Sequence, residues 1–184
     1  MNKKVAIIAI TFICVQLASA QQIYITHSGL ASFVSDAPLE VIKAESSEVS
    51  GAINLDDRSF AFNIDNKTFK GFNSSLQQEH FYENYLETHI YPYSSFKGKI
   101  IEEIDLNSDK EQTVRAKGKL EIHGVSQDRI VKGTLKIKGD TILLKADFTV
   151  LLEDHQINIP RVVYQKIASE IFVSISAQLI RKTD

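Results

Sequence analysis

The chain has almost no cysteine and, beyond its first twenty residues, no long apolar run, and each shortage excludes a class of protein. The one cysteine, Cys14, lies close to the N-terminus, so the rest of the chain cannot form an internal disulfide. No later segment is apolar over the length that a membrane-spanning helix needs. The chain must therefore be stabilised by an apolar core, and its length suits one domain of ordinary size.

The first twenty residues have the composition of a secretory signal peptide. Basic Lys3 and Lys4 precede an apolar run of about thirteen residues, Val5–Leu17, and small residues follow at Ala18 to Ala20. That run is shorter than the roughly 20 residues of a membrane-spanning helix. We therefore predict cleavage near Ala20, one mature domain over residues 21–184, and a periplasmic or secreted location without stable membrane insertion.

Positive charge is also in deficit once the signal peptide is removed. The mature segment holds 19 basic residues against 23 acidic ones, which gives a net charge of −4 with neutral histidines. Proteins that bind nucleic acid need a basic field against the phosphates, so we expect no nucleic-acid partner. The exception is a lysine-rich set of alternate positions in residues 113–138. We interpret it as a solvated sheet face that resists edge pairing, with binding to an anionic surface or headgroup as the alternative.

Catalytic and metal-binding motifs are absent from the sequence. There is no G-x-S-x-G nucleophile motif, and no two of the five histidines are three, four or five residues apart. We interpret the histidines as surface or loop residues and predict no catalytic residue, no metal ligand and no cofactor. A metal-dependent or hydrolytic enzyme would require His80 or His89 to meet another histidine or a carboxylate in the fold. The histidines are His27, His80, His89, His123 and His155.

The strongest structural signal is a strict alternation of apolar and charged residues between positions 113 and 138. Alternate side chains on a strand point to opposite faces, so this segment predicts two antiparallel strands that share one buried face. We place the turn between them at His123 to Asp128. The inward positions are Val114, Ala116, Gly118, Leu120 and Ile122 in the first arm, and Val131, Gly133, Leu135 and Ile137 in the second.

Similar alternation recurs along the mature chain and predicts seven or eight strands. One helix is expected from the Ser74–Gln77 capping box to about Glu87, where its aromatic side would cover one end of the sheet. The sequence shows no alternation of strands with helices, so the fold should be a closed barrel or a sandwich. We favour an antiparallel barrel of about eight strands, because consecutive hairpins can close into a ring that leaves no unpaired strand edge. The other predicted strands are 23–34 with a kink at Gly29, 49–55, 60–64, 94–101, 141–152 and 171–179, while 39–44 fits a strand or a helical turn and 161–168 a helical turn.

The inner face mixes small residues with phenylalanines, and this pattern leaves two interpretations open. A barrel of about eight strands can be filled by side chains or can hold one slender ligand. Repeated small residues favour a cavity, but equally the phenylalanines could fill the space that the glycines leave, or the glycines could relieve the coiling of the strands. The small positions are Gly51, Gly98, Ala116, Gly118, Gly133, Ala146 and Ala177, and the large ones are Phe60, Phe62, Phe96 and Phe148.

Three segments together resemble the YceI family. HFYENYLETHIYPYSSFKGKI at residues 80–100 is similar to the family's helix followed by a phenylalanine-bearing strand. GKLEIHGVSQDRIVKGTL at 118–135 resembles its G-x-L-x-I-x-G-V-[ST] run, and ADFTVLLEDHQINIP at 146–160 resembles a strand that ends in an acidic residue. The chain departs from the family pattern at His155-Gln156, where an aromatic residue and glycine are usual, and at 62–65.

The resemblance implies a secreted, lipocalin-like barrel that holds an isoprenoid chain, such as a quinone tail or a polyprenyl lipid, along its axis. We therefore predict a non-enzymatic binding protein for an apolar, isoprenoid-like molecule. The alternative is a filled barrel that acts as an envelope interaction or stress protein without a small ligand, and the sequence is compatible with an oligomer in either case. The predicted ligand-binding residues are Phe33, Phe60, Phe62, Phe81, Tyr85, Phe96, Leu120, Phe148 and Ile175.

Overall fold

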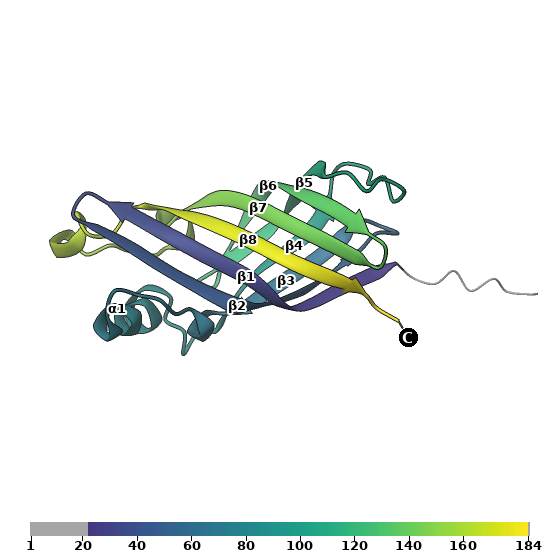
Figure 1. The fold of residues 1–184 in the computed structure, drawn as a ribbon. Coiled ribbons are helices and arrows are strands. Elements are labelled where there is room, and N and C mark those ends of the chain that lie inside the picture. The colour runs from purple at the N-terminus through teal and green to yellow at the C-terminus, as the bar shows by residue number, and fades with distance from the viewer. Residues whose placement is uncertain (1–21, 184) are drawn as a thin grey trace, which may run out of the picture.

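Eight antiparallel strands close into a barrel in the computed structural model of the chain, which describes residues 22–183 (Figure 1). Each strand pairs with its neighbours in sequence, and β8 pairs with β1 to complete the ring. The predicted all-β antiparallel barrel is therefore confirmed. The strands are β1 (Ile23–Ala37), β2 (Glu40–Asn54), β3 (Ser59–Asp65), β4 (Tyr93–Ile100), β5 (Gln112–Ile122), β6 (Val125–Lys138), β7 (Thr141–Leu151) and β8 (Glu170–Arg181).

The predicted signal peptide, residues 1–20, lies outside the described residues, so cleavage near Ala20 stays a prediction. Between residues 22 and 183, none of the helices combines the length and the apolar character that crossing a membrane requires.

The two ends of the barrel differ in the connections that they carry (Figure 1). One end, called here the helical end, holds the β1–β2 turn, the β5–β6 turn and two longer segments, 66–92 and 152–169. The opposite end holds the β2–β3 and β6–β7 turns and the 101–111 loop. The helices all belong to the helical end, so the predicted position of the helix at one end of the barrel is confirmed. They are η1 (Asn66–Thr68), α1 (Ser75–His80), η2 (Phe81–Tyr85), η3 (Glu153–His155) and η4 (Arg161–Val163).

The hairpin of β5 and β6 confirms the predicted alternation but corrects its turn. Val114 and Leu120 are buried, while the neighbouring Arg115 and Lys119 are exposed. The turn consists of His123 and Gly124 alone, because both have positive φ angles, 51° and 69°, as a two-residue hairpin turn requires. The predicted turn over 123–128 was therefore too long, and β6 begins at Val125.

Strands β1 and β2 resolve two features that the sequence left open. The β1–β2 register shifts on both sides of Gly29, which confirms a kink there as a bulge in the ladder. Residues 40–44 are part of β2 and not a helical turn. The resulting strands of 15 residues each form the longest pair in the barrel.

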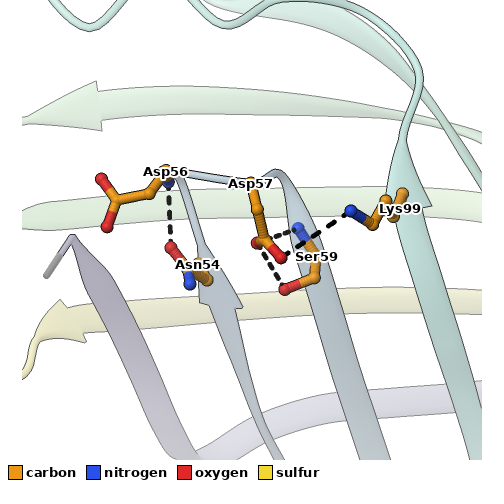
Figure 2. A network of polar contacts seen from close by, with 5 residues as sticks. All are labelled: Asn54, Asp56, Asp57, Ser59 and Lys99. Atoms are coloured by element: carbon orange, nitrogen blue, oxygen red, sulfur yellow. Dashed lines mark hydrogen bonds and ion pairs between the residues drawn. The ribbon is translucent and has the colours of Figure 1, made fainter.

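The β2–β3 turn at the opposite end is held by carboxylate and amide side chains (Figure 2). The Asn54 amide oxygen accepts a hydrogen bond from the Asp56 N–H at 2.9 Å. Asp57 accepts from the Ser59 hydroxyl at 2.6 Å and from its N–H at 3.0 Å, and Lys99 lies 3.8 Å from the same carboxylate. These bonds stabilise the charged form, so the pKa of Asp57 lies below its ordinary value.

The helix of segment 66–92 begins as predicted and ends slightly earlier. The Ser74 hydroxyl accepts from the Gln77 N–H at 3.2 Å, as in a capping box, whereas the Gln77 side chain accepts from the Asn73 N–H rather than from that of Ser74. Six α-helical residues pass directly into the π-helical turn η2, which ends at Tyr85. Glu87 has a φ of 43°, so the helix cannot extend to it as predicted. Of the predicted helical turn over 161–168, only 161–163 is helical, as η4.

Candidate ligand-binding cavity

A cavity of about 570 Å³ lies inside the barrel. Along β2 its lining extends from Glu40 at the helical end to Ile53 near the opposite end. Thirteen residue steps correspond to roughly 43 Å along the strand at about 3.3 Å per residue, which is about 30–35 Å along the barrel axis for strands tilted by about 35–45°. The volume falls within the roughly 300–1,000 Å³ that is usual for small-molecule sites, and the cavity is long for that volume. Its shape therefore suits a slender ligand.

The opposite end of the barrel is filled by a packed apolar cluster. Ile142 and Leu179 in this cluster have no exposed surface, and neither lines the cavity. Ile53, Phe60 and Val114 belong to the same cluster and do line the cavity, so they form its floor. The cavity is consequently closed toward the β2–β3 turn.

The lining at the helical end includes polar side chains. Glu40, Gln77, His80 and Lys166 all line the cavity there, and His80 and Lys166 are exposed to solvent. Gln77 donates to the Glu40 carboxylate at 3.1 Å, which joins α1 to the start of β2. His80 belongs to α1 and Lys166 to the 152–169 segment, and both line the cavity while they are exposed to solvent. We therefore place the mouth of the cavity between these two segments.

Aromatic side chains fix the helical segment to the barrel wall beside this mouth. The Phe33 ring on β1 stacks on the Phe81 ring of η2 with centroids 5.3 Å apart, and contacts Phe69 at 5.4 Å and Phe72 at 6.0 Å. Such pairs stabilise by roughly 0.5–1.5 kcal/mol each beyond the burial of their area. The four rings therefore attach the helical segment to β1 and form a large part of the cavity wall at the helical end.

The structure brings all nine predicted ligand-binding residues to the cavity wall. Their contact with a ligand stays a prediction. Deeper in the barrel, the Phe60 ring lies 4.9 Å from that of Phe96 and 6.2 Å from that of Phe62. The residues on the wall are Phe33, Phe60, Phe62, Phe81, Tyr85, Phe96, Leu120, Phe148 and Ile175.

Sequence reasoning missed two aromatic residues of the wall, Phe69 and Phe72. They lie between β3 and α1, where the chain has no alternation, so no periodic signal assigned them to a face. Their position around Gly71, immediately before the predicted aromatic helix, was the only hint that the sequence offered.

The small inward residues, whose role the sequence left open, have two different roles in the structure. Ala116, Gly133 and Ala146 line the cavity, but Gly98 and Gly118 do not. These two glycines pair across β4 and β5, and a Cβ on Gly98 would overlap the Lys117 carbonyl oxygen and lie 2.6 Å from the Gly118 Cα. Close backbone approach, and not space for a ligand, requires glycine at this pair.

At Gly51, an aromatic side chain fills the space that the glycine leaves. Its cross-strand partner is Phe62, and a Cβ added to Gly51 would overlap the Phe62 ring. The ring thus fills the space beside this glycine, as in pairs where an aromatic side chain covers a strand glycine. Both sequence interpretations therefore hold, each for different residues.

Polar groups next to the cavity are satisfied by the protein itself. Asn66 is fully buried, donates to the Tyr91 carbonyl at 3.0 Å and accepts from the Ser94 hydroxyl at 2.8 Å. Burial raises the pKa of the Tyr85 hydroxyl, so this group is neutral at physiological pH. The inner part of the cavity therefore offers an uncharged, mainly apolar environment.

Two of the histidines, His123 and His155, lie in connections between strands, as loop residues do, but their side chains make structural contacts there. The His155 side chain is almost completely buried, and its Nδ1 donates to the Val125 carbonyl at 3.0 Å. His123 Nδ1 donates to the His155 carbonyl at 3.1 Å, and its Nε2 lies 2.6 Å from the Glu87 carboxylate. These bonds join the β5–β6 turn to both long segments of the helical end.

His80 and His89 are both exposed, and neither side chain takes part in a hydrogen bond or ion pair within residues 22–183. In the same part of the chain, no three His, Cys, Asp or Glu side chains converge in a way that could hold a metal ion. The convergence that a metal-dependent or hydrolytic enzyme would require at these two histidines is thus not observed.

Comparisons with known proteins agree with this architecture. Residues 22–179 match the model of the YceI-like domain. No curated protein sequence matches the chain.

Solved structures share the fold at low sequence identity. A polyisoprenoid-binding domain from Saccharophagus degradans is 12% identical, with a TM-score of 0.71 over 89% of this chain and 100% of that one. BcnA from Burkholderia cenocepacia is 16% identical, with a TM-score of 0.67 over 84% and 96% of the two chains. The YceI protein of Campylobacter jejuni is 12% identical, with a TM-score of 0.57 over the full length of both. Because the family model covers nearly the whole barrel, the chain belongs to the YceI-like family.

Proposed function

We propose that the barrel binds an apolar isoprenoid chain, such as a polyprenyl lipid or a quinone tail, along its cavity and catalyses no reaction. The observation that carries this proposal is the elongated cavity, which has an apolar wall, a packed floor and polar groups at its mouth. A long chain without charge can enter such a space without leaving a polar group unsolvated, while a polar headgroup stays near the mouth. The solved polyisoprenoid-binding domain with the same fold supports this choice of ligand.

The cavity also weighs against the alternative of a filled barrel without a ligand. In a filled barrel, close-packed side chains would occupy the interior from Phe60 to the helical end, because protein interiors leave few voids. Here about 570 Å³ remains open above the floor, although a second apolar cluster packs the wall beside the mouth.

We further propose that the protein acts in the periplasm or outside the cell. The basic and apolar N-terminal residues, with small residues near Ala20, support export. N-terminal sequencing of protein from the periplasmic fraction should begin close to Gln21. An intact N-terminus in the cytoplasmic fraction would contradict export.

A pair of Ala→Phe variants tests the ligand site. Ala146 lines the cavity, whereas Ala61 is exposed on the outer face of β3, so both variants add the same ring. Protein extracted with organic solvent should release an isoprenoid from wild type and from Ala61→Phe. Ala146→Phe should release roughly tenfold less or lower still, since overpacking costs about 1–3 kcal/mol.

Thermal unfolding of each variant controls for a folding defect, and Ala116→Leu provides a second blocking variant on another strand. Equal isoprenoid content in the wild-type protein and in two folded blocking variants would overturn the proposal. So would a wild-type protein that binds no added polyprenyl compound.

A further inference from the structure

The outer faces of three neighbouring strands carry basic residues in cross-strand register. The pairs that face each other are Lys97 with Lys119 and Lys99 with Lys117 between β4 and β5, and Arg115 with Lys132 between β5 and β6. Facing side chains on adjacent strands lie about 4.5–5.5 Å apart at their Cβ atoms, so each pair brings two positive charges together. We call these six residues the basic face.

Like charges in facing positions destabilise a sheet, and the protein neutralises only part of the basic face. Lys99, Lys119 and Arg115 have carboxylate partners, which are Asp57 at 3.8 Å, Asp128 at 3.3 Å and Glu102 at 2.6 Å. No ion pair within residues 22–183 involves the other three members, which are Lys97, Lys117 and Lys132. Two further carboxylates lie next to the set: Glu121 on β5 beside the Lys97–Lys119 pair, and Asp147 on β7, which follows Ala146, the partner of Gly133, and so lies beside Lys132.

The basic face contrasts with the rest of the chain, which is acidic overall. The whole sequence has 21 basic and 23 acidic residues, so a cluster of six cations on three strands is a local concentration and not a general property. Such a local field attracts an anionic partner even when the net charge of the protein is negative.

An exposed isoleucine lies inside this charged surface. Ile130 on β6 faces Lys117 on β5, and 59% of its surface is exposed to solvent. An apolar side chain among lysines fits a surface that has both negative charge and an apolar layer beneath it, as a lipid bilayer has. A soluble polyanion would offer nothing to this side chain.

The dimensions of the basic face also suit a membrane surface. Strands in a sheet are about 4.8 Å apart, so β4 to β6 spans roughly 10 Å, and the four residue steps from Arg115 to Lys119 span roughly 13 Å. All six cations can therefore lie within about one Debye length of the same anionic plane at physiological ionic strength.

We propose that the basic face docks the barrel on the anionic phospholipid surface of a bilayer. The choice of a bilayer as partner rests on the proposed function, because an isoprenoid carrier exchanges its ligand with a membrane. The basic face lies on β4 to β6, on the side of the ring opposite the β8–β1 junction, and none of its six residues lines the cavity. Docking and ligand binding therefore use different residues and can be tested separately.

Sedimentation of lipid-free protein with vesicles tests docking directly. The vesicles contain phosphatidylcholine alone or an equal mixture of phosphatidylcholine and phosphatidylglycerol, and no isoprenoid. Wild type should bind the mixed vesicles, less strongly as salt is raised, and should not bind phosphatidylcholine alone. Each cation removed should weaken the affinity roughly fivefold. The variant Lys97→Gln/Lys117→Gln/Lys132→Gln should therefore bind the mixed vesicles on the order of 100-fold more weakly.

A matched control removes the same charge elsewhere. Lys43, Lys67 and Lys70 are exposed on β2 and the adjoining segment, and Lys43→Gln/Lys67→Gln/Lys70→Gln should bind nearly as wild type does. Ile130→Ser should weaken vesicle binding without weakening binding to heparin. Ala146→Phe should still bind vesicles, so a failure of docking is distinguishable from a failure of ligand binding.

Three results would overturn the proposal. The first is no preference of the wild-type protein for the mixed vesicles. The second is an equal loss in the basic-face variant and the control variant. The third is tight binding to heparin without binding to vesicles, which would assign the basic face to a soluble polyanion.

Discussion

A pair of Leu→Ala substitutions measures directly whether the barrel is packed at one end and hollow above it. Leu179 belongs to the packed cluster, has no exposed surface and does not line the cavity. Leu120 is also buried, at 6% exposure, but its side chain lines the cavity. The same three side-chain carbons are therefore removed from a filled site and from the edge of an existing void.

The two sites should differ in the free energy of unfolding. Leu179→Ala leaves a new void in a packed region and should cost about 3–5 kcal/mol, since void volume adds about 24 cal/mol per Å³ to the transfer term. Leu120→Ala only enlarges a cavity that is already present, so little beyond a transfer term of about 2 kcal/mol is expected. At roughly 2–4 °C per kcal/mol, the melting temperature should fall by about 6–20 °C for Leu179→Ala and about 4–8 °C for Leu120→Ala.

Urea unfolding of lipid-free protein provides the measurement, with the slope m checked for two-state behaviour. Equal losses at the two sites would refute the reasoning, because they would mean that Leu120 is as tightly packed as Leu179. A larger loss at Leu120 would place the void at the other end of the barrel.

Two further predictions concern the walls and turns of the barrel. Ser59→Ala removes the largest cause of the lowered pKa of Asp57, so that pKa should rise toward its ordinary value of 3.8, as NMR titration of the carboxyl carbon would show. Because the folded-state pKa is depressed, the charged Asp57 stabilises the protein above the unfolded-state pKa, and this contribution is lost as pH falls through the lowered value; an unchanged pKa in Ser59→Ala would contradict this account. Gly118→Ala should destabilise by about 1–3 kcal/mol, because its Cβ would overlap the Lys97 carbonyl oxygen, whereas Ala61→Gly on the outer face should cost no more than about 1 kcal/mol. Thermal unfolding compares the two, and a Gly118→Ala protein as stable as wild type would show that the strands can separate there.

The sequence predicted the strands because alternation is a local property. Residues such as Val114 and Leu120 indicate their face without any knowledge of their neighbours, and the structure buries them as expected. The same reasoning identified Phe33 and Phe148 on the wall of the cavity, since an inward position in a barrel is a position facing the lumen.

Features that depend on pairing between distant segments could not be predicted in this way. The sequence could not decide whether Gly98 and Gly118 leave space for a ligand, because only the β4–β5 register shows that they face each other. The His123–Glu87 contact joins residues 36 positions apart, and no spacing rule connects them. The division of the barrel into a packed end and a hollow end likewise depends on the complete ring.

Native mass spectrometry of the protein as purified can detect a lipid held in the cavity. We expect a population heavier than the apoprotein by the mass of one isoprenoid lipid, which gas-phase activation releases as an intact molecule. Ala146→Phe should lack this population, and Ala61→Phe should retain it. A wild-type protein that shows only the apoprotein mass, and still shows no shift after incubation with polyprenyl compounds, would contradict the claim that the cavity holds such a chain.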